Sequence, residues 1–202
     1  KYAVCCALGK LKDKRCTEEL LKLINDKNRL IQKAAIESIG EIGDDSAFEG
    51  LISITKNKPT EIKIAIADTL GKIGKNYVKR MINILEKTED KNIKWVIIKA
   101  LGEIGDKEAG YPILKNLEDP DYEIREVSAE ALGKIKFEEG IDKLIEYLKD
   151  KEWSVRKKVV EAFGRIGNKK VLEYLYQLEK EEKVKDVLSK IKEVIKILEK
   201  IS

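Results

Sequence analysis

The chain has 202 residues, of which 39% are charged, and its 41 basic and 37 acidic side chains leave a net charge of +4. This near balance weighs against a nucleic-acid partner, because phosphate recognition needs a concentrated basic field. The lack of histidine removes histidine-based catalysis, and no apolar run reaches the roughly 18 residues of a membrane-spanning helix. No signal-peptide pattern opens the chain, but the sequence begins without methionine, so a preceding segment stays an open alternative.

One pattern recurs along the chain with a period of 31 residues, and it is clearest in the stretch 93–105. Six glycines mark the period without a slip: Gly9, Gly40, Gly71, Gly102, Gly133 and Gly164. A fixed period of about 20–50 residues is typical of a solenoid, in which each repeat packs on its neighbours.

In chain order, residues 1–15 match only the second half of the unit and predict a partial N-terminal repeat. Residues 16–168 predict five regular repeats, each a pair of helices that we name helix A and helix B. Residues 169–202 carry a long amphipathic helix without the glycine and predict a C-terminal capping repeat. The predicted fold is therefore all-α, a single domain over residues 1–202. It is an α-solenoid of antiparallel helix pairs, with about six units plus the N-terminal half-unit.

The helical assignment depends on the spacing of apolar side chains. One helix B carries Ile93, Ile97, Leu101 and Ile104, which fall on a single stripe of an α-helix. Helix A carries one apolar column, with the members Leu20, Leu51, Ile82, Ile113, Leu144 and Leu175. The alternation that a strand requires is missing, so we expect helices throughout.

Residues of special conformation mark the predicted helix ends. The side chains of Asp44, Asp106 and Asn168 can accept from free backbone N–H groups and predict N-caps of helix A. The glycines that follow helix B predict C-caps with positive φ, at Gly43, Gly74, Gly105 and Gly167. Lys136 stands in this column instead of glycine, so we expect its turn to be the least regular. The 31-residue glycine column lies inside helix B and predicts close packing between neighbouring units.

The pattern Val/Ile-Arg/Lys-x-x-Ala-x-x-Ala-Leu-Gly-x-Ile-Gly-Asp resembles the HEAT-like repeats first associated with phycobilisome lyases. The resemblance extends from Lys1 to about Gly167 and is best in the stretches 123–133 and 154–164. It implies a right-handed superhelix in which the B helices line a concave face. The broad class includes chromophore lyases, an iron-dependent hydroxylase and binding scaffolds. The hydroxylase type needs histidine–glutamate pairs, so its activity is excluded for a chain without histidine.

The outward columns of helix B predict where a partner would bind. Taking Ile93 as buried, we expect an exposed patch of apolar, aromatic and charged side chains on the concave face, with the members Ile64, Trp95, Val96, Lys99, Tyr122, Glu126, Val127, Glu130, Trp153 and Lys157. Large aromatic side chains flanked by charge are typical of protein interface anchors. For Tyr122 and Trp153 the alternative is that they merely pack the turn between helix A and helix B. The charges on this face are nearly balanced, which argues against a phosphate-binding trough.

The three cysteines predict neither a disulfide framework nor a metal site. Their number is odd and two are adjacent, so a reducing cytoplasm is the expected compartment. Cys5 and Cys16 align with small apolar positions and are expected to be buried, whereas Cys6 is expected to point outward. We expect no catalytic residue, no metal and no cofactor.

These observations favour a non-enzymatic scaffold or adaptor that binds a protein or peptide on the concave face of an α-solenoid, without a membrane. An alternative from the resemblance is a lyase-type subunit that handles a tetrapyrrole or another flat ligand. Nucleic-acid binding is less favoured by the charge balance. A further contact, or further repeats, at the N-terminal end is also expected.

Overall fold

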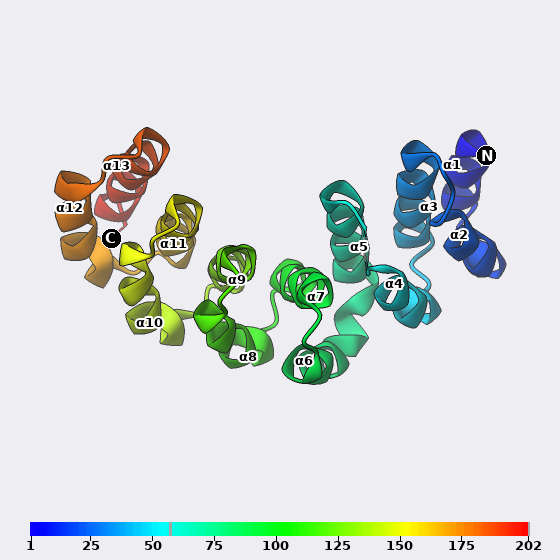
Figure 1. Cartoon of the computed structure of the whole chain (residues 1–202), viewed down its shortest axis with the longest axis horizontal. Helices are drawn as coiled ribbons and strands as arrows, with labels where there is room; N and C mark the ends of the chain where they lie inside the picture. Colours follow the sequence, from blue (N-terminus) through cyan, green and yellow to red (C-terminus); the bar gives the residue numbers. More distant parts are fainter. Residues whose placement is uncertain (57, 202) are drawn as a thin grey trace. The chain divides into compact units, whose positions relative to one another are not determined.

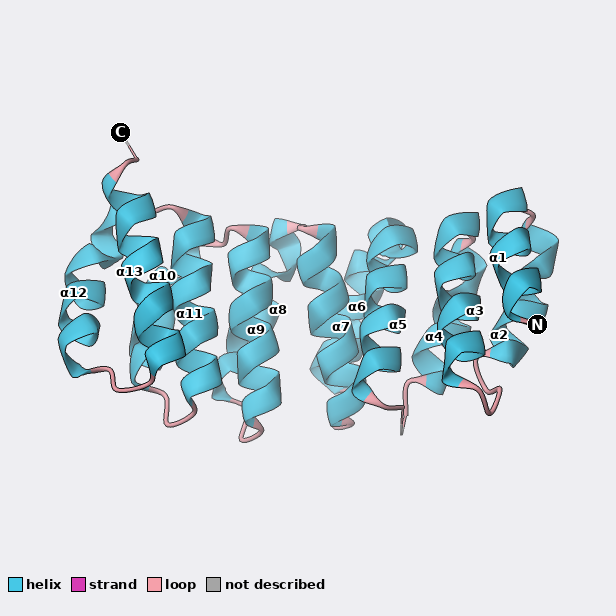
Figure 2. Cartoon of the chain, turned by 90° about the horizontal axis from the view of Figure 1, so that it is seen from above, coloured by secondary structure: helices cyan, strands magenta, loops and turns pink. Residues whose placement is uncertain are grey.

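The computed structural model describes residues 1–56 and 58–201. Within these ranges every regular element is an α- or 3₁₀-helix, which confirms the all-α prediction (Figure 2). The helices form two compact units, Lys1–Ile104 and Gly105–Ser202, which we call the N-terminal unit and the C-terminal unit. No helix in the described ranges combines the length and the apolar character needed to cross a bilayer.

The N-terminal unit consists of helices α1 (Tyr2–Leu11), α2 (Thr17–Leu23), α3 (Arg29–Ile42), α4 (Phe48–Ile54), α5 (Thr60–Ile73), α6 (Val78–Lys87) and α7 (Lys91–Ile104). The B helices α1, α3, α5 and α7 pack side by side in one layer (Figure 1). The A helices α2, α4 and α6 lie on the other side of that layer, each against the helix B that follows it. This is the alternation that a repeated pair of helices predicts.

The C-terminal unit consists of α8 (Gly110–Lys115), α9 (Tyr122–Ile135), α10 (Ile141–Glu146), α11 (Trp153–Ile166), α12 (Leu172–Glu181) and α13 (Lys185–Glu199). The B helices α9, α11 and α13 again pack side by side, with the A helices α8, α10 and α12 behind them (Figure 1). Helices α8 and α10 are short because each ends in a 3₁₀ turn, η5 (Asn116–Glu118) and η7 (Tyr147–Lys149). A 3₁₀ turn also precedes each helix A, at Lys14–Cys16, Asp45–Ala47, Gly74–Tyr77, Lys107–Ala109, Glu138–Gly140 and Lys169–Val171.

The apolar stripe of helix B is the core of each repeat. In α5, Ile62, Ile66, Leu70 and Ile73 are all buried, as the 3.6-residue period predicts. The corresponding Ile93 of α7 is only half-buried, so the assumption that it is buried is wrong.

The glycine column has the packing role that its spacing predicts. A Cβ added at Gly133 of α9 would lie 2.6 Å from the Cα atom of Ala162 in α11, closer than real Cβ contacts allow. A Cβ at Gly9 of α1 would lie 3.0 Å from the Cα atom of Ser38 in α3. Glycine therefore lets neighbouring B helices approach at these points, at a helix-propensity cost of up to about 1 kcal/mol.

The predicted caps at Asp44, Asp106 and Asn168 form, but each caps the 3₁₀ turn that leads into helix A and not helix A itself. Asp44, Asp106 and Asn168 each accept a hydrogen bond from the backbone N–H two residues further on, at 3.1, 2.9 and 3.0 Å. The second carboxylate oxygen of Asp44 also accepts from the hydroxyl of Thr17 at 2.6 Å. These bonds satisfy N–H groups that the first turn leaves free.

The predicted C-caps are correct for three glycines and wrong for one. Gly43, Gly105 and Gly167 have φ values of +69°, +76° and +79°. Gly74 instead has φ −88° and begins a four-residue 3₁₀ turn, where a Cβ would run into the Cε atom of Met81. A methyl group at Gly74 would therefore displace the end of the Met81 side chain. The longer turn also shifts α6 by one residue, so that Met81 is buried and Ile82 only half-buried.

The turn at Lys136 is regular, contrary to expectation. Lys136 adopts the left-handed conformation, with φ 55°. Its N–H donates to the carbonyl of Gly133 at 3.2 Å, and the N–H of Phe137 donates to the carbonyl of Leu132 at 3.1 Å. The buried Phe137 ring anchors the turn, so the lysine is held in a backbone conformation that usually favours glycine.

Candidate functional site

The surface that each layer of B helices presents to solvent consists of side chains spaced four residues apart. In the N-terminal unit these are Arg29, Lys33, Glu37 and Glu41 on α3, Thr60, Ile64, Asp68 and Lys72 on α5, and Lys91, Trp95, Lys99 and Glu103 on α7. In the C-terminal unit they are Tyr122, Glu126, Glu130 and Lys134 on α9, and Trp153, Lys157, Glu161 and Arg165 on α11. All are exposed or half-buried, and we call this set the outward B surface.

Two of the predicted site residues are not on the outward B surface. Val96 is 0% exposed and Val127 is 5% exposed, so their assignment to an exposed patch is wrong. Each follows an outward residue by one position, and one residue rotates the side chain by about 100° around the helix. For Val96 this rotation places it on the same edge as Ala100, one turn further along, whose carbonyl lies 3.8 Å from the Cβ position at Gly71 of α5. Val96 therefore belongs to the packing between B helices.

In the N-terminal unit, Ile64 and Trp95 occupy equivalent positions on the adjacent helices α5 and α7. Ile64 is 38% exposed, and Trp95 is half-buried. The Nζ atom of Lys63 lies 5.4 Å from the centroid of the Trp95 ring and 3.2 Å from Oδ1 of Asn92. A cation over the ring face orients the indole before any partner arrives.

In the C-terminal unit, Tyr122 and Trp153 are the first residues of the adjacent helices α9 and α11. Each is 44% exposed, so each ring both packs on its turn and presents a large surface to solvent. Glu126 and Lys157 lie one turn further along the two helices and are half-buried. Within the described part of the chain, neither Glu126 nor Lys157 forms an ion pair within 4.0 Å.

Two further predicted site residues are engaged in ion pairs. Glu130 accepts from Lys134 at 2.8 Å and from Lys158 of α11 at 2.9 Å. Burial would raise the pKa of Glu130, but the hydrogen bonds and positive charges of these two lysines hold that pKa at about 2. The Nζ atom of Lys99 lies 3.5 Å from Oε1 of Glu103. These contacts give Glu130 and Lys99 roles in holding the helices, whatever a partner contributes.

A buried guanidinium network holds the turns that carry Tyr122 and Trp153. Arg125 donates from Nε and Nη2 to the carboxylate of Asp150, at 2.7 and 3.0 Å, and from Nη1 to the carbonyls of Asp119 and Pro120. Asp150 in turn accepts from the backbone N–H of Glu152, beside Trp153. The arginine thus ties the turn before α9 to the turn before α11.

The next repeat makes the same connection. Arg156 donates from Nε and Nη2 to Glu182, at 2.7 and 2.9 Å, and from Nη1 to the carbonyl of Asp150 at 2.9 Å. The hydrogen bond from Arg156 lowers the pKa of Glu182. Burial would raise the pKa of Asp150, but its bonds to Arg125 outweigh burial and leave that pKa lowered. Sequence reasoning noted the basic position of the repeat but missed its carboxylate partners, which lie 25 or 26 residues downstream.

The cysteines differ in part from expectation. Cys5 is buried, and burial raises the pKa of its thiol. Cys16 is half-buried, so its expected burial is wrong; it ends the 3₁₀ turn before α2, at the margin of the core. All three thiols are free, and among residues 1–56 and 58–201 no three cysteine or carboxylate side chains gather as a metal-binding group would.

Comparison with known proteins gives one family and a group of structures. A family profile described as HEAT repeats matches residues 1–61, 48–117 and 110–196. A search of curated protein sequences finds no match.

The structural neighbours share the architecture at low sequence identity. The Escherichia coli protein YibA aligns with TM-score 0.56 and 21% identity, covering 98% of this chain and 74% of that one. Human deoxyhypusine hydroxylase aligns with TM-score 0.52 and 18% identity, covering 98% and 78%. A designed armadillo repeat protein in complex with the peptide (KR)4 aligns with TM-score 0.52 and 14% identity, covering 89% and 98%. At these identities the likeness shows the fold alone.

Proposed function

Because this chain belongs to the HEAT-repeat family, we propose that it is a non-enzymatic scaffold that binds a protein or peptide on its outward B surface. The observation that carries this proposal is the exposure of Tyr122 and Trp153 at the same register of two adjacent helices. Solenoids offer such rows of equivalent side chains to extended partners, because every repeat presents the same face.

The chemistry of Tyr122 and Trp153 suits an interface anchor. Aromatic side chains bury a large area while losing few rotatable bonds, and tyrosine and tryptophan dominate measured interface hot spots. The bonds of Arg125 and Asp150 hold both turns in place, which reduces the ordering cost of binding. Glu126 and Lys157, one turn away, offer a carboxylate and an ammonium that have no ion-pair partner in the described chain.

The N-terminal unit offers a second contact of the same kind at Ile64 and Trp95. Lys63 covers part of the Trp95 ring, so the surface that is left for a partner is smaller than at Tyr122 or Trp153. We therefore assign the main anchor to the C-terminal unit and an auxiliary contact to the N-terminal unit. The designed armadillo protein with bound (KR)4 supports the general idea that this type of architecture can hold a peptide.

The test is a selection of peptides from a random display library on the whole chain. We expect selected peptides to lose at least tenfold in affinity for a Tyr122→Ala/Trp153→Ala variant, since each truncation of an aromatic anchor costs about 2 kcal/mol or more. Tyr111→Ala is the matched control, because Tyr111 is also exposed but lies on helix α8 of the A layer. Circular dichroism checks that both variants stay folded.

Selected peptides that bind the double variant as tightly as the wild type would contradict the proposal. A selection that enriches no binder at all would contradict it as well.

A further inference from the structure

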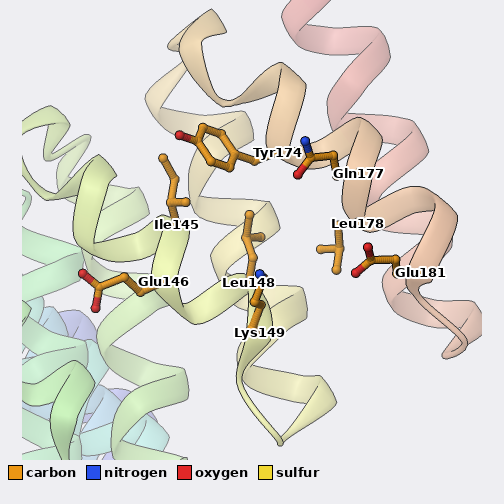
Figure 3. Close-up of a pocket in the computed structure, with 8 residues that line it drawn as sticks. All are labelled: Ile145, Glu146, Leu148, Lys149, Tyr174, Gln177, Leu178 and Glu181. Carbon is orange, nitrogen blue, oxygen red and sulfur yellow. The ribbon is translucent and has the colours of Figure 1, made fainter.

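A hollow of the N-terminal unit and a hollow of the C-terminal unit differ in the charges that line them. Figure 3 shows the hollow of the C-terminal unit, between α10 with its 3₁₀ turn η7 and α12. Its charged lining is mixed, with Glu146 and Glu181 beside Lys149. The hollow of the N-terminal unit is larger, about 660 Å³ against about 260 Å³. We call it the basic hollow, and its lining consists of Lys27, Arg29, Gln32, Lys58, Pro59 and Asn92.

Among the described residues, three cations line the basic hollow and no carboxylate does. Lys27 forms no ion pair within 4.0 Å in the part of the chain that the structure describes. The Nη1 atom of Arg29 lies 3.5 Å from Oε1 of Glu61, but both side chains are mostly exposed, so this pair contributes little. The positive charge of the lining is therefore largely uncompensated.

The third cation, Lys58, is half-buried, whereas Lys27 and Arg29 are exposed. Its Nζ atom donates to two uncharged acceptors, the carbonyl of Ile24 at 3.1 Å and Oδ1 of Asn25 at 3.0 Å. Burial lowers the pKa of Lys58, because burial disfavours the charged form of the ammonium. A carboxylate that reached this ammonium would stabilise its charged form.

Carboxylates close to the basic hollow in the sequence are engaged elsewhere. The carboxylate of Asp26 accepts from Nζ of Lys1 at 2.7 Å and from the backbone N–H of Asn28 at 2.9 Å. The carboxylate of Asp90 accepts from the backbone N–H of Asn92 at 2.9 Å, at the beginning of α7. Neither carboxylate is available to the cations of the basic hollow.

The repeat itself indicates which charge is missing. One column of the 31-residue period supplies carboxylates to cations 25 residues upstream, as in the pairs Lys1–Asp26 and Arg125–Asp150. Two successive members of this column are uncharged, since it consists of Asp26, Asn57, Thr88, Asp119 and Asp150. The cation upstream of Thr88 is Lys63, which is only 8% exposed and donates to Asn92 in the lining of the basic hollow. The N-terminal unit thus keeps its cations at a place where the carboxylates of the column are absent.

We propose that the basic hollow binds an acidic segment of the partner protein, with carboxylates on Lys27, Arg29 and Lys58. These carboxylates supply the negative charge that the column lacks at positions 57 and 88. Hydrogen bonds between ionised groups are roughly twice as strong as those between neutral ones. The charge of the whole chain is close to balance, which favours a polypeptide over a nucleic acid as the occupant. This inference rests on the proposed function, because it names the chemistry of the partner.

The test uses two peptides of glycine and serine that carry an uncharged fluorescent label. One peptide contains four glutamates, and the other contains four glutamines at the same positions. Both are titrated with the whole chain by fluorescence polarisation at low ionic strength, where screening is weakest. We expect the glutamate peptide to bind at least tenfold more tightly, because only its side chains carry the charge that the lining lacks.

A matched pair of variants locates the binding. Lys27→Glu/Arg29→Glu should weaken binding of the glutamate peptide at least tenfold, and both side chains are exposed, so the variant keeps its fold. Lys75→Glu/Lys79→Glu makes the same change of net charge in the same unit. Lys75 lies in the 3₁₀ turn Gly74–Tyr77 and Lys79 on α6, outside the basic hollow. This control should change the affinity less than threefold.

Equal binding of the glutamine peptide would overturn the proposal, and so would equal losses in the two variants. A glutamate peptide that does not bind at millimolar protein would do the same. Single-stranded oligothymidylate that binds more tightly than the glutamate peptide, with the same dependence on Lys27 and Arg29, would assign the basic hollow to nucleic acid instead.

Peptides selected from the random library separate this inference from the proposed function. If they lose affinity for the Tyr122→Ala/Trp153→Ala variant while the glutamate peptide does not bind, only the acidic segment is refuted. If the selection enriches no binder and the glutamate peptide does not bind either, both are refuted.

Discussion

The N-terminal and C-terminal units repeat the same pair of helices but hold their turns together differently. In the C-terminal unit, Arg125 and Arg156 each make a two-pronged bond to a carboxylate of the next repeat. The same position in the N-terminal unit holds Gln32, Lys63 and Lys94. Gln32 donates to the carbonyl of Asp26 at 2.6 Å, and Lys63 donates to the side-chain oxygen of Asn92 at 3.2 Å.

The contacts between neighbouring B helices also differ between the N-terminal unit and the C-terminal unit. In the N-terminal unit the hydroxyls of Ser38 and Thr69 donate to carbonyls of the preceding helix B, at 2.8 and 3.1 Å. The equivalent position in α11 is Ala162, whose backbone approaches Gly133 closely. The repeat therefore fixes the geometry, while the side chains that stabilise it vary from one unit to the next. The exposed Tyr122 and Trp153 lie in the C-terminal unit, whose turns are held by the Arg125–Asp150 and Arg156–Glu182 ion pairs.

The largest expected effect is the loss of one buried guanidinium. Arg125→Ala leaves the buried carboxylate of Asp150 without its partner, which costs about 3–5 kcal/mol of unfolding free energy. Gln32→Ala, at the equivalent position of the N-terminal unit, should cost about 1 kcal/mol, the value of an ordinary hydrogen bond. Urea unfolding with hydrogen exchange to locate the loss measures both. Equal losses would show that the two units are held alike.

Acid should weaken the C-terminal unit through Glu130. The pKa of Glu130 is about 2 in the folded protein, below the value of about 4.3 in the unfolded chain. Its contribution to the free energy of unfolding is therefore complete above about pH 5 and is lost as the pH falls toward 2. The contribution is at most about 3 kcal/mol. Because each unit holds one tryptophan, the Trp95→Phe variant reports the C-terminal unit alone by fluorescence. Glu130→Gln in that background should flatten the pH dependence of stability, and an unchanged slope would refute the assignment.

Glycine-to-alanine substitutions distinguish two kinds of contact between B helices, one with the backbone of the neighbouring helix and one with a side chain. Gly133→Ala places a methyl group 2.6 Å from a backbone atom, and overpacking of this kind costs about 1–3 kcal/mol. At Gly40 the nearest atom is the Thr69 hydroxyl at 3.2 Å, so this neighbour has to yield by only a few tenths of an ångström. Gly40→Ala should therefore be nearly neutral, since the gain in helix propensity offsets the crowding. Melting temperatures compare the pair, and a Gly133→Ala variant as stable as Gly40→Ala would contradict the close approach.

The smallest expected effect is at the Lys63–Trp95 contact. Lys63→Met keeps the aliphatic stem but removes the cation over the ring, which costs about 0.5–2 kcal/mol. In a Trp153→Phe background the emission of Trp95 should shift, because a nearby positive charge is lost. An unchanged spectrum and unchanged stability would show that the ammonium does not act on the indole.

The sequence predicted those features that depend on local periodicity. The stripe of α5, the cap at Asp106 and the close approach at Gly133 follow from the 31-residue period and from the chemistry of single residues. Features that depend on a neighbouring element were harder to predict. Val96 and Val127 each lie one position from an outward residue. Their burial depends on the neighbouring elements that pack against this side of the helix, which the periodicity of a single helix does not reveal.

Two other differences have the same origin. Lys136 keeps a left-handed turn because Phe137 is buried beside it, and no property of lysine indicates this. The carboxylate that Arg125 binds lies 25 residues downstream, so its pairing appears only when two turns are brought together. For the candidate site, sequence reasoning identified the exposed rings of Tyr122 and Trp153 but placed too many neighbours beside them.

The most direct test of the central proposal is a ¹⁹F NMR titration of the chain labelled with 5-fluorotryptophan. The two tryptophans give one resonance for each unit. Addition of a peptide selected on the whole chain should shift the Trp153 resonance. The dissociation constant from this shift should equal the one measured by fluorescence polarisation with the same peptide carrying a fluorescent label. A peptide that binds by polarisation while the Trp153 and Trp95 resonances both stay in place would contradict binding on the outward B surface.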